Sequence, residues 1–410
     1  TMERISIEQA IRELGKTVRV AGYVHEFRNL GKIKFILLRD QTGIVQVITR
    51  DDIELNREDV IDVIGDSVKS DIAKAGVEIK AKRIEIISRV RRKIPVDPAG
   101  YVPTDFDTRL KYRFLDLRKA EVRRIFEIKS KIINSYRNSL LKRGFVEIHP
   151  SLIIGAASEG GAEVFPVDYF ERKAYLAQSP QLYKQMAVIG GLERVFITLP
   201  IYRAEKHNTI YHLNEAISLD VEMGFIDDHR DVMRILKTVV LEMLDSVKDM
   251  VNIDVGDIKI YSYEEIVKLL NENNVHINIG EDLSKEHERK IYEILGEELY
   301  FIEKFPTKIR AFYTMPDDDI YSRSFDLFFR GLEIASGAQR IHDVDMLERA
   351  LIDRGLKLED FDFYLEAFRY GVPKHGGFGM GLERFVMQLL RLNNIREAML
   401  FPRDRTRLIP

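Results

Sequence analysis

The chain has 410 residues, enough for two or three domains that each have their own core. Its 63 basic and 66 acidic residues leave a formal net charge of −3, so any nucleic-acid surface must be a local patch. Cysteine is absent, which excludes disulfides and thiolate metal sites, and no apolar run or signal-peptide pattern suggests a membrane, so we expect a cytoplasmic protein.

The sequence pattern of residues 1–94 predicts a β-rich domain. Short runs of β-branched and aromatic residues follow one another, and Asp40–Gly43 supplies a turn between two of them. Residues 77–82 alternate apolar and charged side chains, as in a half-buried strand. With a helical stretch between the strands, the pattern favours a five-stranded barrel of the oligonucleotide-binding (OB) type. Any other small β-barrel fits the pattern about equally well.

Residues 95–120 are expected to form a hinge, because proline and glycine are dense at its start and make a stiff connector. Residues 121–143 place apolar side chains three and four positions apart, which predicts an amphipathic helix that ends at Gly144.

This helix begins a second domain, residues 121–410, in which helices alternate with strands. The expected strands lie at 195–198, 217–225, 325–329 and 332–335. Residues 252–298 are charge-rich and predict a small helical insertion.

Three separated stretches of the second domain combine arginines with acidic neighbours. A guanidinium offers planar, bidentate contacts to phosphate and can stack on a purine. Each stretch alone is a weak signal, since most Arg–Glu pairs are surface ion pairs, and the glycine-dense one lacks the Lys-Ser/Thr of a P-loop. The stretches are Tyr202-Arg203-Ala204-Glu205 with His212-Leu213-Asn214-Glu215, Glu333 to Arg340, and Gly376 to Arg384.

Together and in this order the stretches resemble motifs 2 and 3 of the class II aminoacyl-tRNA synthetases. The run Gln178-Ser179-Pro180-Gln181-Leu182-Tyr183-Lys184-Gln185 resembles the aspartyl-tRNA synthetase family of class IIb, in its archaeal form. The resemblance extends from Gly22 to Arg405. It implies an α+β fold, with an OB-type β-barrel that binds the anticodon before a class II catalytic domain, whose antiparallel sheet is flanked by helices.

The resemblance also implies an ATP-dependent ligase of protein biosynthesis, active as a homodimer. It would join L-aspartate to tRNA-Asp through an aspartyl-adenylate, with Mg²⁺ as cofactor, and charging of tRNA-Asn as well stays open. Arg203 and Arg384 are the expected catalytic residues. The implied ATP-binding residues are Arg203, Glu205, Tyr211, His212, Leu213, Glu333, Gly381, Leu382, Glu383 and Arg384.

Two further features of the ATP site are the residue at position 211 and the expected metal ligands. The family usually carries arginine where this chain has Tyr211, so one phosphate contact would depend on Lys206 or Arg384. Glu333 and Ser336 are the expected ligands of Mg²⁺, a hard cation that prefers oxygen, and Asp326 is a second acidic group nearby.

The implied aspartate site unites two cations, Lys184 and Arg340, which suit the side-chain carboxylate. Glu159 and Gln181 suit the substrate ammonium, and Arg203 and Ser336 complete the set.

The implied anticodon-binding residues are Arg28, Phe35, Gln46 and His25. From its sequence pattern alone, Phe35 would be barrel core. His25 suggests relaxed reading of the anticodon, whereas Lys74 matches the discriminating pattern.

Three alternatives stay open beside this interpretation. An asparaginyl-tRNA synthetase would share the ATP residues but has no use for two cations at its amide pocket. An asparagine synthetase would not need the barrel, and a tRNA-binding module without activity would not need the arginines. One further departure from the family is Pro150, which lies one position early in the stretch that resembles the dimer-forming motif 1.

Overall fold

The structure is a computed structural model that describes residues 2–156 and 163–410. It divides into two compact units, Thr1–Arg124 and Ile125–Pro410, which are described separately below. Within the described ranges, none of the helices is both long and apolar enough to cross a bilayer.

The first unit contains a closed five-stranded barrel with the order β1-β2-β3-β5-β4, which confirms the predicted barrel. Its neighbours pair antiparallel except β3 with β5. The helix that packs into the barrel core is α1 (Ile7–Arg12), which precedes the strands, so the expectation of a helical stretch between them was wrong. The strands are β1 (Thr17–Asn29), β2 (Lys34–Arg39), β3 (Ile44–Thr49), β4 (Val60–Lys69) and β5 (Val77–Ser88).

The segment expected to be a hinge contains two short helices, α2 (Phe106–Lys111) and α3 (Arg113–Asp116). Asp116 is fully buried and accepts hydrogen bonds from Arg109 and Arg113 at 3.0 and 2.8 Å. Arg118 forms an ion pair with Glu58 of the barrel at 2.9 Å. The segment is therefore an ordered part of the first unit.

The second unit is built on an eight-stranded sheet that is antiparallel except at its edge pairs β12–β13 and β6–β10. This confirms the antiparallel sheet that the family resemblance implied. In sheet order the strands are β12 (Lys259–Ser262), β13 (Leu299–Glu303), β14 (Ser324–Phe329), β15 (Leu332–Gln339), β16 (His375–Gly381), β11 (Glu215–Gly224), β10 (Arg194–Tyr202) and β6 (Val146–Glu147).

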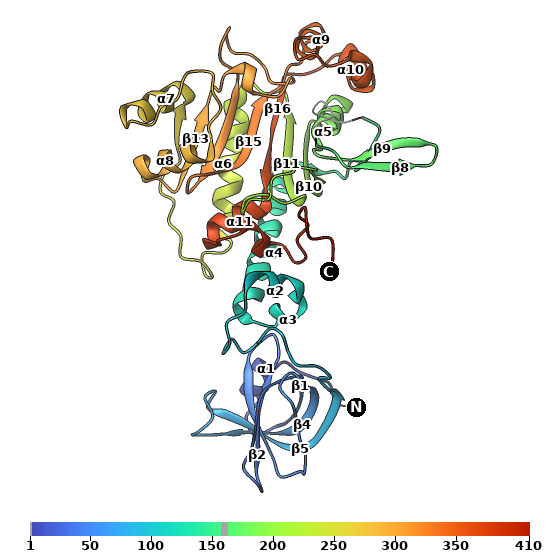
Figure 1. Cartoon of the computed structure of the whole chain (residues 1–410), viewed down its shortest axis with the longest axis vertical. Coiled ribbons are helices and arrows are strands. Elements are labelled where there is room, and N and C mark those ends of the chain that lie inside the picture. The colour runs from blue at the N-terminus through green and yellow to red at the C-terminus, as the bar shows by residue number, and fades with distance from the viewer. Residues whose placement is uncertain (1, 157–162) are drawn as a thin grey trace. The chain divides into compact units, whose positions relative to one another are not determined.

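Residues 252–298, expected to be helical, also supply β12 and so extend the main sheet at one edge. The two helices of this segment, α7 (Tyr263–Glu272) and α8 (Lys285–Leu295), lie beside β13 (Figure 1). The two helices agree with the helical pattern. The strand β12 was not predicted, because four residues leave too short an alternation to see in the sequence.

Three helices bury their apolar sides against the sheet in one core: α4 (Ala120–Leu141), α6 (His229–Asp245) and α11 (Leu382–Leu390). Helix α6 runs across the strands β14 to β16 (Figure 1). Helix α4 matches the prediction to within two residues, and Gly144 follows it with a φ of +79°.

Side chains alternate along each strand, so the helices cover one face of the sheet and leave the other for polar groups. On β11, Leu219 and Val221 join the core, while Asp220 and Glu222 point to the opposite face. The functional site forms on that opposite face.

The remaining elements surround the sheet. They are a three-stranded sheet of β7 (Ile153–Ile154), β9 (Arg172–Leu176) and β8 (Pro166–Tyr169), the helices α5 (Gln181–Ala187), α9 (Val344–Asp353) and α10 (Asp362–Ala367), and short helical turns at Val188–Leu192, Thr307–Ile309, Leu358–Phe361, Phe368–Tyr370 and Ile395–Ala398.

Candidate active site

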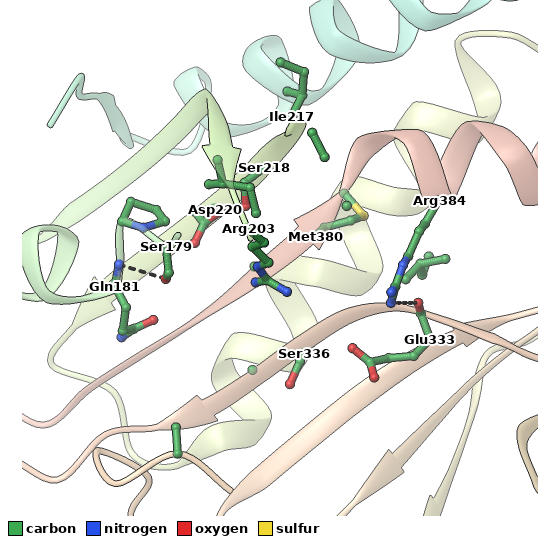
Figure 2. Close-up of a pocket in the computed structure, with 18 of the residues that line it drawn as sticks. Ser179, Gln181, Arg203, Ile217, Ser218, Asp220, Glu333, Ser336, Met380 and Arg384 are labelled. Atoms are coloured by element: carbon green, nitrogen blue, oxygen red, sulfur yellow. Dashed lines mark hydrogen bonds between the residues drawn. The ribbon is translucent and has the colours of Figure 1, made fainter. Parts of the chain in front are cut away.

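A cavity of about 400 Å³ lies over the polar face of the main sheet. Figure 2 shows Arg203 near its middle, with Gln181 on one side and Glu333 and Arg384 on the other. The predicted residues that line the cavity are Gln181, Arg203, Glu205, Tyr211, His212, Leu213, Glu333, Ser336, Arg340, Gly381, Glu383 and Arg384. Folding thus brings together most of the site that the sequence predicted over more than 200 positions.

One end of the cavity adjoins a buried cluster of two cations and two carboxylates. Lys184 Nζ lies 2.9 Å from Asp220 Oδ2 and 3.4 Å from Glu222 Oε2, and Arg340 Nε lies 3.1 Å from Glu222 Oε1. Burial opposes ionisation of Glu222, but Arg340 and Lys184 outweigh it and lower its pKa. The two cations are therefore neutralised by the protein before any substrate arrives.

This cluster changes the expected role of Lys184. Its side chain is 1% exposed and does not line the cavity, whereas Asp220 and Arg340 do. Lys184 Nζ also donates to the backbone carbonyl of Phe378 at 3.1 Å, so it lies behind the carboxylates. Sequence reasoning missed Asp220 and Glu222, although acidic residues that alternate with apolar ones in a buried strand were a visible signal.

The glycines of β16 have a structural role that the sequence did not reveal. A Cβ atom on Gly377 would lie 2.0 Å from the carbonyl oxygen of Val221 and 2.2 Å from Glu222 Oε2. The glycine run therefore lets β16 pack directly against the carboxylates of β11. Contact with a purine, the role expected for these glycines, is open at Gly379 and Gly381, which line the cavity.

The loop after β10 carries three of the predicted nucleotide contacts. Arg203 donates from Nε to the carbonyl of Gln178 at 3.3 Å, and its side chain remains 47% exposed. Glu205 lies 3.8 Å from Arg203 and 3.7 Å from His212. Burial lowers the pKa of His212 despite the nearby Glu205.

At the far end, Glu333 is the best placed group for a cation. Burial, followed by the charge of Asp326, raises its pKa to about 7. Asp326 is held by Arg310 at 2.8 and 3.0 Å, and Arg310 also donates to Ser336 Oγ at 2.7 Å. Arg384 donates to the carbonyl oxygen of Glu333 at 3.3 Å.

The donor set at Glu333 fits an ion that is shared with a nucleotide. No described Lys, Arg or His forms an ion pair with its carboxylate, and no three His, Cys, Asp or Glu side chains of the described residues form a metal cluster. Mg²⁺ is usually bound by one or two carboxylates together with phosphate oxygens and water. Arg310, which lies in none of the motifs, donates hydrogen bonds to Ser336 and Asp326. Glu333 therefore remains available as a ligand for Mg²⁺.

Four predicted ATP contacts belong wholly or partly to the scaffold. Leu382 is fully buried in the core of the second unit and does not line the cavity. Glu383 is 1% exposed and accepts from the backbone N–H of Ile217 at 2.5 Å, and burial raises its pKa. Tyr211 and Leu213 line the cavity but also pack in a small apolar cluster. The predicted contact Glu159 lies outside the described residues.

In the first unit, three of the four predicted anticodon residues share one outer face of the barrel. Arg28 lies directly opposite Phe35 across β1 and β2. Gln46 of β3 lies opposite Leu37, two residues from Phe35, and so points to the same side. Phe35 is half-buried and outside the barrel core, so the alternative that it is a core residue is wrong.

His25 lies at a bulge of β1, between Val24 and Glu26. Its Nδ1 lies 2.9 Å from Arg39 Nη1, and Arg39 in turn pairs with Glu58 through two bonds of 2.9 and 2.7 Å. A guanidinium can only donate, so Nδ1 accepts and the ring proton is on Nε2. Burial, reinforced by Arg39, lowers the pKa of His25. Lys74 is exposed in the loop between β4 and β5.

Comparison with known proteins agrees with both units. Residues 105–405 match the family described as tRNA synthetases class II (D, K and N), and residues 18–87 match the OB-fold nucleic acid binding domain. The chain belongs to the class II aminoacyl-tRNA synthetases of this group. It is 48% identical to Aspartate–tRNA(Asp/Asn) ligase of Methanopyrus kandleri, over 97% of this chain and 96% of that protein. It is 44% identical to Aspartate–tRNA(Asp) ligase of Pyrococcus abyssi, over 97% of each.

Solved structures of the same group share the fold. The asparaginyl-tRNA synthetase of Pyrococcus horikoshii, complexed with asparaginyl-adenylate, superposes with a TM-score of 0.92 at 32% identity over all of both chains. A putative aspartyl-tRNA synthetase of Leishmania major gives a TM-score of 0.90 at 30% identity, over 100% of this chain and 95% of that one. Overall fold alone therefore does not separate aspartate from asparagine enzymes.

Proposed function

We propose that the chain is an aspartate–tRNA ligase, which activates L-aspartate with ATP and transfers it to the 3′ end of tRNA. The observation that carries this proposal is one cavity that joins the buried cluster of Arg340 to the nucleotide-binding groups Arg203, Glu333 and Arg384. The names of its relatives, aspartate–tRNA ligases at 42–48% identity, support the same substrate.

The activation step brings together two anions, the substrate α-carboxylate and the α-phosphate. A carboxylate oxygen bonds to the α-phosphorus while the bond from that phosphorus to the bridging oxygen breaks, which releases pyrophosphate. Arg203 lies between the two ends of the cavity and can donate to both anions, which holds them in line and stabilises the charge that develops.

The remaining nucleotide contacts follow from the same geometry. Glu205 can accept from the adenine amino group, and Arg384 can stack on the purine or reach the terminal phosphate. His212 can donate a hydrogen bond to a terminal phosphate. Glu333 would hold Mg²⁺ together with phosphate oxygens, and the bound ion would neutralise the triphosphate charge.

Selection of aspartate over asparagine depends on Arg340. Its guanidinium presents only donors, which a carboxylate accepts and an amide NH₂ group cannot. Lys184 acts from behind by fixing Asp220 and Glu222, so that the cavity wall keeps its charge pattern without substrate. Gln181, in the cavity wall, can accept from the substrate ammonium.

We propose relaxed choice of tRNA, with aspartate placed on both tRNA-Asp and tRNA-Asn, by a cytoplasmic homodimer. Relatives named for both tRNAs and relatives named for tRNA-Asp alone lie at similar identity, so the names do not decide the choice. His25 favours the relaxed form, because a single imidazole covers less of a base than a larger ring.

Aminoacylation of both tRNAs with aspartate and with asparagine tests the proposal. We expect aspartate on both tRNAs and no charging with asparagine. A preference for tRNA-Asp of a thousandfold or more, about 4 kcal/mol, would contradict relaxed recognition. Charging with asparagine alone would replace the function by that of the asparaginyl enzymes.

A further inference from the structure

The loop of residues 203–214 carries cavity side chains. Its described internal bonds lie at its base and in a short turn, where Tyr211 N–H donates to Thr209 Oγ1 at 3.2 Å. The loop is closed at its base, where Arg203 N–H donates to the carbonyl of Asn214 at 2.9 Å and Asn214 Nδ2 donates back at 2.8 Å. Residues 206–210 are exposed. The position of Glu205 and His212 therefore depends on what packs against the loop from outside it.

Arg396, in the turn that follows α11, uses every nitrogen of its guanidinium to make such contacts. Nη2 donates to Asn208 Oδ1 at 2.6 Å, and Nη1 donates to the carbonyl of Thr209 and to Asn394 Oδ1, both at 3.2 Å. Nε donates to Asp404 Oδ2 at 2.6 Å. Arg396 is 7% exposed, so these charge-assisted bonds are partly shielded from solvent.

The segment of residues 401–407 completes the contact on the other side. The second oxygen of Asp404 accepts from backbone amides of its own turn, which fixes the carboxylate against Arg396. The carbonyl of Arg403 accepts from Asn214 N–H at 2.9 Å, and Ile395 N–H donates to the carbonyl of Ile210 at 2.9 Å. The loop is thus bound at its base and at its far half.

We propose that Arg396 is a positioning residue for the nucleotide, because it ties the loop 203–214 to the segment 401–407 and so holds Glu205 and His212 at the cavity. The inference rests on the proposed function for its catalytic readout. Apart from Arg203, which the base of the loop holds, the residues that face aspartate lie outside the loop: Gln181 on α5, Ser336 on β15 and Arg340 just after β15. Loss of Arg396 should therefore weaken the handling of ATP and leave that of aspartate.

The test is aspartate-dependent ATP–pyrophosphate exchange by Arg396→Gln, with ATP and aspartate varied separately. We expect the KM for ATP to rise at least about tenfold, which is about 1.4 kcal/mol, with the KM for aspartate within about twofold of the wild type. Arg396→Lys should restore only part of the affinity for ATP, since a single ammonium nitrogen cannot reach four acceptors in different directions. An unchanged KM for ATP, or an equal rise in both constants, would overturn the proposal.

Removal of Arg396 leaves Asp404 buried without its cation, and this can destabilise the unit. Asn208→Ala tests the same tie from the exposed side of the loop, where unfolding is not expected. Asn208→Ala should raise the KM for ATP by a smaller factor than Arg396→Gln. The double variant should have a KM for ATP close to that of Arg396→Gln alone, because both changes break the same contact. Fully additive effects would contradict the tie.

Arg330→Gln is the matched control. The side chain of Arg330 is also only 8% exposed. It pairs with Glu298 and donates to the carbonyl of Gln388 at 2.6 Å, away from the loop. We expect a lower melting temperature with both constants unchanged. A rise in the KM for ATP as large as that of Arg396→Gln would mean that lost stability alone explains the effect.

Equilibrium binding of ATP without aspartate separates the two proposals. If the wild type has no aspartate-dependent exchange, the proposed function fails. If ATP binds the wild type and Arg396→Gln with equal affinity, the positioning role fails.

Discussion

Arg203 and Lys184 are both cations of the candidate site, but their surroundings differ. Arg203 is 47% exposed and its one described carboxylate neighbour, Glu205, lies 3.8 Å away. Lys184 is 1% exposed and neutralises Asp220 and Glu222. Arg203 is therefore available to a ligand, whereas Lys184 is part of the protein's own charge balance.

Alanine at Arg203 should abolish aspartate-dependent ATP–pyrophosphate exchange, because charge stabilisation of about 3 kcal/mol or more is lost, and it should leave the free energy of unfolding nearly unchanged. Arg384→Ala should behave in the same way.

Lys184→Met should lower the free energy of unfolding by about 3 kcal/mol, since two buried carboxylates lose a partner. Denaturant unfolding and the exchange assay measure both effects. A stable Lys184→Met protein would contradict the buried cluster.

Glu333→Gln should raise the Mg²⁺ concentration that exchange requires by about tenfold, because a neutral amide is a poorer ligand for a hard cation. Titration of exchange activity with Mg²⁺ measures the change. The exposed Glu359→Gln serves as a control with no expected effect. An unchanged Mg²⁺ dependence in Glu333→Gln would leave Glu333 a structural carboxylate.

At the scale of elements, one buried carboxylate joins the start of α6 to the end of β13. Glu303 Oε2 lies 2.7 Å from His229 Nε2, and Glu303 Oε1 lies 2.6 Å from Arg230 Nη2. Burial opposes ionisation of Glu303, but His229 and Arg230 outweigh it and lower its pKa from 4.5 to about 2. Ionised Glu303 thus stabilises the packing of the helix on the sheet.

Because the pKa is depressed in the folded state, the stabilisation is complete above pH 4.5 and is lost as the pH falls toward 2. Glu303→Gln should lower the free energy of unfolding by about 3 kcal/mol at pH 7, and the difference from the wild type should shrink across that window. Unfolding at several pH values measures it. Asp245→Asn, in an exposed pair with Lys248, should change little. A difference that is constant from pH 7 to pH 2 would contradict the ion pair.

For the whole molecule, the candidate anticodon-binding face and the candidate active site lie in separate compact units, each with its own core. The barrel face of Arg28, Phe35 and Gln46 belongs to the first unit, and the cavity belongs to the second. A surface change in one unit should therefore leave the chemistry of the other intact.

Phe35→Ala should weaken aminoacylation of tRNA-Asp and tRNA-Asn alike by about 1–3 kcal/mol, because it removes a stacking surface for an unpaired base. ATP–pyrophosphate exchange should not change. Ile87→Ala, exposed on β5 outside the β1–β3 face, is the control and should leave both activities unchanged. Loss of ATP–pyrophosphate exchange in Phe35→Ala would contradict the independence of the two sites.

The sequence by itself determined the barrel, the helix α4 and the positions of Arg203, Glu333 and Arg384. The first two were predictable because strands and amphipathic helices repeat over a few residues. The candidate site residues could be proposed from the sequence because each lies in a short contiguous motif whose order matches one family.

Only the tertiary structure decided which charges meet. The pairing of Lys184 with Asp220 and Glu222, the hold of Arg310 on Asp326 and Ser336, and the tie from Arg396 to the loop 203–214 were not predicted. These contacts join segments up to 188 positions apart. A charged residue carries no local signal of its partner, because the partner is selected by how strands and helices pack and by the need to neutralise charge once it is buried.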